Sequence, residues 1–197
     1  MSSPQPSYGS LPVLLFAHRD DWTRWLAANQ ALSTGVWLQL AKKAASITSL
    51  SYAEALDAAL CYGWIDGQKQ RYDAASWLQK FTPRGAKSIW SKVNCEKVQV
   101  LIDGGRMQPA GLAAVERAKH DGRWDAAYDS QSRATVPADL QAALDANTEA
   151  QAFFATLTSG NRYAILFRIQ TAKQAETRAR RIGEFIRMLE QHETLHP

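Results

Sequence analysis

The chain has 197 residues, of which 46% are hydrophobic and 21% charged, and its formal net charge at pH 7 is +4. This length and composition predict one domain, or one domain with a large extension, and exclude a disordered or low-complexity chain. No apolar run approaches the roughly 18 residues of a membrane-spanning helix. The longest run, over residues 11–17, lacks the flanks of a signal peptide. We therefore expect a soluble, cytoplasmic protein.

The first 85 residues alternate between strand and helix patterns. Residues 1–10 form a turn-rich stretch that we expect to be a disordered tail. Short strands are predicted over 11–16 and 36–41, with a helix between them that Asp20 or Asp21 begins and that ends before Gly35. Ser51 and Glu54 have the spacing of a capping box at the start of a second helix.

A β-hairpin is predicted next, over residues 68–72 and 76–82, because these stretches carry the aromatic residues that sheets favour. Residues 11–85 therefore predict an α+β domain with a small antiparallel sheet. The rest of the chain has helical periodicity. We expect a helical connector over 86–134, with one helix begun by Ser88 and another by Pro109, and an all-helical C-terminal region over 135–197 begun by Pro137.

The positive charge is concentrated in two segments. Residues 69–97 and 161–187 each carry seven cations against two acids, whereas residues 101–160 carry five cations against eight acids. Two basic segments of this kind could bind anions such as nucleic acid or lipid head groups, or they could be two solvated faces.

Several kinds of active site are not supported by the residues. His192 and His196 have the i, i+4 spacing of zinc ligands, but no acid completes the motif. The chain has no nucleophile elbow, no phosphate-binding glycine-rich loop and no CxxC pair. Cys61 lies in an apolar run and is interpreted as a small buried hydrophobe. We expect no metal and no cofactor.

The segment from residue 63 to residue 94 is the candidate binding site. It combines an acid of buried type, amides, an arginine that suits a carboxylate or phosphate, and tryptophans, which is the composition of small-ligand pockets. The candidate ligand-binding residues are Asp66, Gln68, Trp77, Arg84, Trp90 and Asn94. The alternatives are that Asp66 only pairs with Arg84 or caps the hairpin, and that Asp66 is the acid or base of an enzyme.

Seven stretches resemble the YdeI/OmpD-associated family, also called bacteriocin-protection proteins. They span roughly residues 35–197 and are GWIDGQK (63–69), WLQKFTPR (77–84), SIWSKVN (88–94), GRMQPAG (105–111), GRWDAAYD (122–129), NRYAIL (161–166) and QTAK (170–173) leading to RARRI (178–182).

The resemblance implies a role in survival against bacteriocins and cationic peptides, and the family name points to an outer-membrane porin as a partner. It implies no reaction, cofactor or catalytic residue. Because a chain of charge +4 repels a polycationic peptide, we expect indirect protection through binding of a small or anionic cell component. Nucleic-acid binding through the two basic segments, which no recognised motif supports, and an enzyme acting on a small metabolite are the alternatives.

Overall fold

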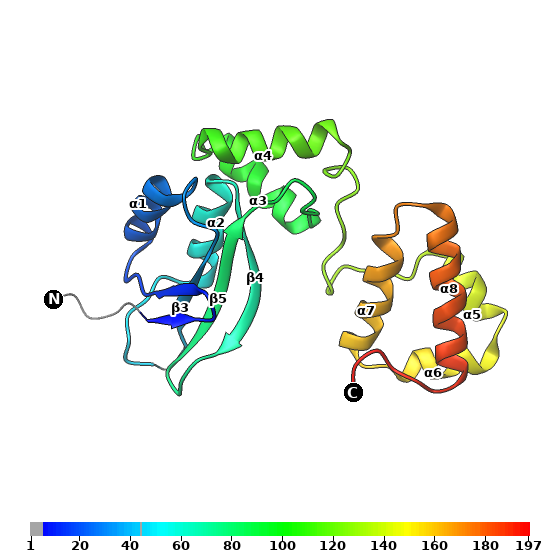
Figure 1. Ribbon diagram of the computed structural model, residues 1–197. Coiled ribbons are helices and arrows are strands. Elements are labelled where there is room, and N and C mark those ends of the chain that lie inside the picture. The colour runs from blue at the N-terminus through cyan, green and yellow to red at the C-terminus, as the bar shows by residue number, and fades with distance from the viewer. Residues whose placement is uncertain (1–5, 44) are drawn as a thin grey trace. The chain divides into compact units, whose positions relative to one another are not determined.

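The computed structural model describes residues 6–43 and 45–197 (Figure 1). The chain forms two compact units. The N-terminal unit comprises the residues up to Ser88 together with Asn94–Asp125, and the C-terminal unit comprises Ile89–Val93 together with Ala126–Pro197. Strands occur in the first unit and the second is helical, so the predicted α+β class is confirmed.

The N-terminal unit is built on a five-stranded sheet in the order β1-β2-β3-β5-β4. Its strands are β1 (Ser7–Tyr8), β2 (Leu11–Leu14), β3 (Val36–Ala41), β4 (Trp64–Arg71) and β5 (Ser76–Pro83). The sheet is mixed, whereas an antiparallel one was predicted: β2 and β3 run parallel, and the other pairs are antiparallel. The reason is helix α1 (Arg19–Asn29), which carries the chain back between β2 and β3, as a crossover between parallel strands requires.

The predicted disordered tail over 1–10 needs a second correction. Residues 1–5 lie outside the described part of the chain, but Ser7 and Tyr8 form β1 and pair with β2. The Tyr8 ring meets the Trp37 ring edge-on at 5.2 Å, and Pro6 O accepts a hydrogen bond from Val13 N at 2.7 Å. These contacts give the end of the tail a place on the sheet.

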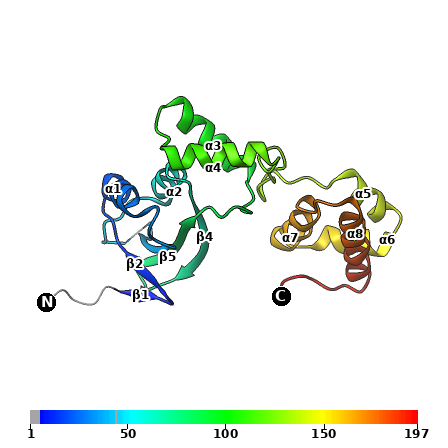
Figure 2. The same ribbon diagram turned by 45° about the horizontal axis from the view of Figure 1, so that its top comes forward.

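Helices α1 and α2 (Tyr52–Cys61) pack together on one face of the sheet (Figure 2). Trp22 of α1 is fully buried there, with its ring stacked on Trp25 and in contact with Trp64 of β4 and Phe81 of β5. Its indole Nε1 donates to Ala55 O at 3.0 Å, which joins the two helices. The predicted capping box of Ser51 and Glu54 begins α2.

Helix α4 (Pro109–His120) and, from Asn94 onward, helix α3 (Lys92–Asp103) complete this unit. Pro109 occupies the first turn of α4, as predicted. Helix α3 begins at Lys92 rather than after Ser88, because the preceding backbone is used elsewhere: Tyr128 N donates to Trp90 O, and Lys92 N donates to Tyr128 O.

The C-terminal unit is a bundle of α5 (Ala138–Asp145), α6 (Thr148–Thr156), α7 (Ser159–Gln170) and α8 (Ala175–Glu190). One apolar core joins all four helices, and its fully buried members include Leu140, Ile165, Ile169 and Leu189. The predicted all-helical region over 135–197 is confirmed, and Pro137 immediately precedes α5 as expected.

Arginines of the second basic segment bond to helix ends in this bundle. Arg178 donates to Ile169 O and pairs with Asp139, and Arg181 donates to Arg168 O. Arg162 donates to Ala155 O, at the end of α6. Cationic side chains in such positions satisfy the free carbonyls that end a helix. Much of this segment's charge therefore serves the fold.

A polar network around Asp129 closes the start of the bundle. The carboxylate accepts hydrogen bonds from Lys92 Nζ at 2.9 Å and from Gln170 Nε2 at 2.7 Å. Gln170 Oε1 accepts from Asp129 N, and the Tyr163 hydroxyl donates to Asp129 O. The hydrogen bond from Lys92 and the one from Gln170 hold the pKa of Asp129 below its ordinary value.

This network predicts an acid-sensitive C-terminal unit. Because the folded pKa of Asp129 is depressed, its contribution to stability is present above the unfolded pKa of about 4 and is lost as the pH falls through the folded value. Asp129→Asn should lower stability at neutral pH by about 1 kcal/mol or less, since Lys92 is half exposed. Urea unfolding followed by circular dichroism gives the free energy of unfolding at each pH. As the pH drops below ~4, this free energy should decrease less steeply for Asp129→Asn than for the wild type. Parallel pH curves would show that Asp129 is not the group responsible.

Candidate anion-binding site

The six candidate residues do not gather at one point. Asp66 and Gln68 lie on β4 and Trp77 lies on β5, in the same hairpin. Arg84 follows β5 directly, seven residues beyond Trp77, and at about 3.3 Å per residue the two are separated by roughly 20 Å. Asn94 lies on α3, and Trp90 belongs to the C-terminal unit.

Arg84 lies at the open end of the hairpin, directly after β5 and beside the residue that precedes β4. It is 9% exposed, and its backbone N donates to Gly63 O at 2.9 Å. Its charge opposes the effect of burial on the Cys95 thiol of α3, where burial nevertheless raises the pKa to about 11. Cys95 is therefore a protonated thiol at neutral pH. Arg84 and Asn94 thus lie on the α3 side of the unit, away from Trp77.

Asp66 bonds to a helix. Its carboxylate accepts a hydrogen bond from the Tyr52 hydroxyl at the start of α2, at 2.7 Å. Tyr52 also contacts the Trp77 ring, with the ring centres 6.1 Å apart. Asp66, Tyr52 and Trp77 therefore occupy the same face of the sheet, the face on which the helices lie.

A β-bulge decides which side chains of β4 share this face. Asp66 pairs with Phe81, but the next pair is Lys69 with Gln79. Two residues of β4, at positions 67 and 68, therefore lie opposite a single residue of β5. Because side chains alternate along a strand, regular pairing would have put Gln68 and Gln70 beside Trp77. The bulge instead brings Lys69 and Arg71 to the face of Trp77.

A buried amide holds the bulge. Gln79 is 4% exposed, and its Nε2 donates to Gly67 O at 2.9 Å and to Gln68 O at 3.2 Å. These two carbonyls lie within the bulge, where the ladder is interrupted. Gln68 thus contributes its backbone here, while its side chain is exposed.

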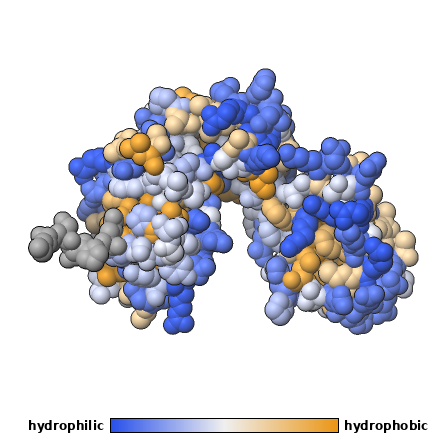
Figure 3. All heavy atoms as spheres, viewed as in Figure 1, coloured by the Kyte–Doolittle hydropathy of each residue, from blue (hydrophilic) through white to orange (hydrophobic). Residues whose placement is uncertain are grey.

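A hollow of about 430 Å³ opens near the turn that joins β4 to β5, and four of its lining residues are cations. We call it the basic hollow, and it is lined by Ala41, Lys42, Lys43, Lys69, Gln70, Arg71 and Trp77. None of these residues is acidic. Figure 3 shows strongly hydrophilic atoms, in blue, at the end of the sheet where β4 and β5 turn back, beside paler and apolar ones. The hollow is large enough for a small ligand.

Two of the four cations are held in place. Lys69 Nζ lies 4.3 Å from the centre of the Trp77 ring, in a cation–π contact. Lys42 Nζ donates to Asp73 O at 2.7 Å and to Ala74 O at 3.0 Å, in the turn between β4 and β5. Each ammonium group is thereby positioned before any ligand arrives.

The turn between β4 and β5 contains an acid, Asp73, whose carboxylate is directed into the turn. The Asp73 carboxylate accepts hydrogen bonds from Ala75 N and from both the backbone N and the hydroxyl of Ser76. The bonds from Ser76 are the main cause of a lowered pKa of Asp73. Asp73 therefore stays ionised and shapes the turn, and it does not line the basic hollow.

Sequence reasoning identified Trp77 but missed the cations around it. Lys69 and Arg71 belong to the predicted basic segment, yet regular alternation would have placed them on the opposite face. Lys42 and Lys43 follow β3, and β3 pairs directly with β5. One sequence signal could have indicated this cluster: two consecutive lysines follow the predicted strand over 36–41, and the predicted hairpin next in the chain carries a tryptophan.

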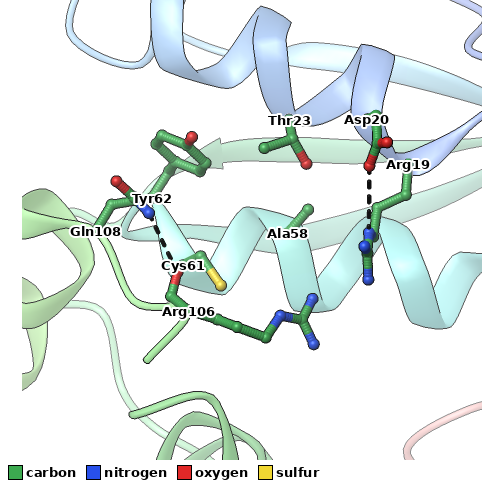
Figure 4. Close-up of a pocket in the computed structure, with 8 residues that line it drawn as sticks. All are labelled: Arg19, Asp20, Thr23, Ala58, Cys61, Tyr62, Arg106 and Gln108. Carbon is green, nitrogen blue, oxygen red and sulfur yellow. Dashed lines mark hydrogen bonds and ion pairs between the residues drawn. The ribbon is translucent and has the colours of Figure 1, made fainter. Parts of the chain in front are cut away.

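A second, smaller hollow of about 160 Å³ lies between α1, α2 and the residues before α4 (Figure 4). It is lined by Arg19, Asp20, Thr23, Ala58, Cys61, Tyr62, Arg106 and Gln108. Burial raises the pKa of the Cys61 thiol, although Arg106 and Arg19 act in the opposite direction. Cys61 is 5% exposed, so it is the buried hydrophobe that was expected and not an activated nucleophile.

Two further features are absent from the described residues. No helix there has the length and apolar character needed to cross a membrane. Within residues 6–43 and 45–197, no three histidine, cysteine, aspartate or glutamate side chains gather as a group that could hold a metal ion.

Comparison with known proteins yields two family models and no individual relative. Residues 14–114 match a domain of unknown function, DUF8412, and residues 133–192 match the family described as "Bacteriocin-protection, YdeI or OmpD-Associated". No curated protein and no solved structure matches the chain.

The resemblance inferred from the sequence is thus confirmed for the C-terminal unit. The stretches at 63–69, 77–84, 88–94 and 105–111, which were ascribed to the same family, lie under the first model instead, and the stretch at 122–129 lies under neither. The basic hollow lies there too. Because that model covers half of the chain, the protein belongs to the DUF8412 family, and residues 133–192 of its C-terminal unit match the model of the bacteriocin-protection, YdeI or OmpD-associated family.

Proposed function

We propose that this protein is a non-catalytic tolerance protein, which protects against bacteriocins and cationic antimicrobial peptides by binding an anionic cell component in the basic hollow. The family description of the C-terminal unit supports the protective role. The observation that carries the binding step is a hollow lined by four cations and no acid.

The charges favour an indirect mechanism. A cationic peptide would be repelled by the basic hollow and by the net charge of +4. An anionic component of the cell, by contrast, would be attracted to both. Binding would sequester or mask this anionic component, so the peptide would no longer encounter it. The peptide itself would not have to contact this protein.

The experiment compares two double variants in a survival assay with a polymyxin-type peptide. Lys43→Ala/Arg71→Ala removes two cations of the basic hollow, and Lys87→Ala/Arg187→Ala removes one lysine and one arginine that are exposed elsewhere. Both lower the net charge by the same amount. We expect the first variant to lose most of the survival advantage and the second to keep it.

Equal expression of the two variants must be shown by immunoblot. Equal loss of protection in both would mean that net charge matters rather than the basic hollow. Full protection by Lys43→Ala/Arg71→Ala would overturn the proposed function of this site.

A further inference from the structure

We propose that the basic hollow recognises a phosphate group that carries two or more negative charges, as in a phosphate monoester or a pyrophosphate. This inference rests on the proposed function, since it names the chemistry of the anion that the same residues would bind. Three features of the hollow lead to this proposal: the side of the strand on which its β4 cations lie, the fixed positions of two of its cations, and the total number of cations.

The bulge in β4 directs the cations. It places Lys69 and Arg71 on the face of Trp77, where regular alternation would have placed two glutamines. The buried amide of Gln79 stabilises the bulge by donating hydrogen bonds to its two carbonyls. A bulge next to a binding site commonly serves to re-aim a side chain in this way.

The fixed positions distinguish this cluster from solvated surface lysines. Lys42 is tethered by two turn carbonyls and Lys69 by the Trp77 ring. Ordering a free lysine around a ligand costs side-chain entropy, and here part of that cost is met in advance. The side chains of Lys43 and Arg71 are exposed and make no hydrogen bond or ion pair with the described residues, so their donors are available to a ligand.

The number of cations selects the class of anion. A carboxylate has one negative charge and two oxygens, so it would leave most of four cations uncompensated. A phosphate monoester has about two negative charges and three strong acceptor oxygens, and a pyrophosphate has more. Lysine ammonium groups suit phosphate as point charges, and arginine adds a bidentate fork. The hollow therefore matches phosphate in both charge and donor geometry.

The test is calorimetric titration of the full chain with pyrophosphate, inorganic phosphate and citrate at one fixed ionic strength. Citrate is the control because it is a multiply charged anion that carries only carboxylates. We expect saturable binding, with pyrophosphate tightest and citrate weakest. Lys43→Ala/Arg71→Ala should weaken pyrophosphate binding by about tenfold or more, Lys43→Arg/Arg71→Lys should largely retain it, and Lys87→Ala/Arg187→Ala should leave it unchanged.

Trp77→Leu tests the positioning of Lys69 separately. Removing the ring frees the Lys69 ammonium, so pyrophosphate binding should weaken while Trp77→Phe, which keeps an aromatic face, retains more of it. Circular dichroism confirms that each variant is folded.

The outcomes separate the two proposals. Equal binding of citrate and pyrophosphate, abolished by Lys43→Ala/Arg71→Ala, would overturn phosphate recognition and leave anion binding in the hollow intact. Binding that both double variants weaken equally would show a diffuse charge effect and overturn the assignment to this hollow. Absence of binding by all three anions, together with normal protection by Lys43→Ala/Arg71→Ala, would overturn both proposals.

Discussion

Gly111→Ala should lower the free energy of unfolding of the N-terminal unit by about 3 kcal/mol or more. A Cβ at this position of α4 would lie 2.2 Å from Cys61 O, 2.8 Å from Cys61 C and 2.8 Å from Met107 Cε. The carbonyl that it meets is fixed, because Cys61 O accepts a hydrogen bond from Gln108 N at 3.0 Å. The added methyl group would push α4 away from the end of α2.

Urea unfolding followed by tryptophan fluorescence measures this effect, because six of the seven tryptophans lie in the N-terminal unit and only Trp90 lies in the other. Gly183→Ala on α8, in the C-terminal unit, is the control with the opposite sign, and its unfolding is followed by far-UV circular dichroism. Nothing lies within 4 Å of its added Cβ, and alanine in an exposed helix should stabilise by up to about 1 kcal/mol. A Gly111→Ala variant as stable as the wild type would show that α2 and α4 do not approach this closely.

Ile169→Ala should destabilise the C-terminal unit by about 2–4 kcal/mol. Ile169 is fully buried in the core that joins α5 to α8. Truncation to alanine removes buried apolar contacts and leaves a cavity that the four helices can close only in part. The loss is a large fraction of the stability that a small helical unit can have.

Two probes locate this effect. Far-UV circular dichroism reports the helices of both units, whereas tryptophan fluorescence reports mainly the N-terminal unit. We expect Ile169→Ala to shift the helical transition to lower urea and to leave the fluorescence transition in place. Ile186→Ala, at a partly buried position beside the same core, should cost clearly less. A common shift of both probes would mean that the two units unfold as one.

Interactions within a few residues were predicted well from the sequence. The capping box of Ser51 and Glu54 and the first-turn position of Pro109 depend only on neighbours along the chain, and both are present. Strand β3 was placed at its observed bounds because its apolar run is short and clearly bounded. The all-helical character of residues 135–197 was also predicted correctly, because helical periodicity is a local pattern.

The candidate site was predicted in part for the same reason. Trp77 and Asp66 were identified from residue type, and they lie on one face of one hairpin. Arg84 was grouped with them because it is near in sequence, but an extended strand separates residues that a helix or turn would keep together.

The sequence by itself therefore determined the class of the fold, most helices and strands, and the family resemblance of the C-terminal unit. The tertiary structure alone decided that β2 and β3 are parallel, that Arg178 and Arg181 cap a helix, and that Lys69 and Arg71 join Lys42 around Trp77. The physical reason is that each of these features depends on partners distant in the chain. A one-residue bulge, held by the amide of Gln79 from the neighbouring strand, reverses the side on which every following side chain lies, and no local pattern in β4 records it.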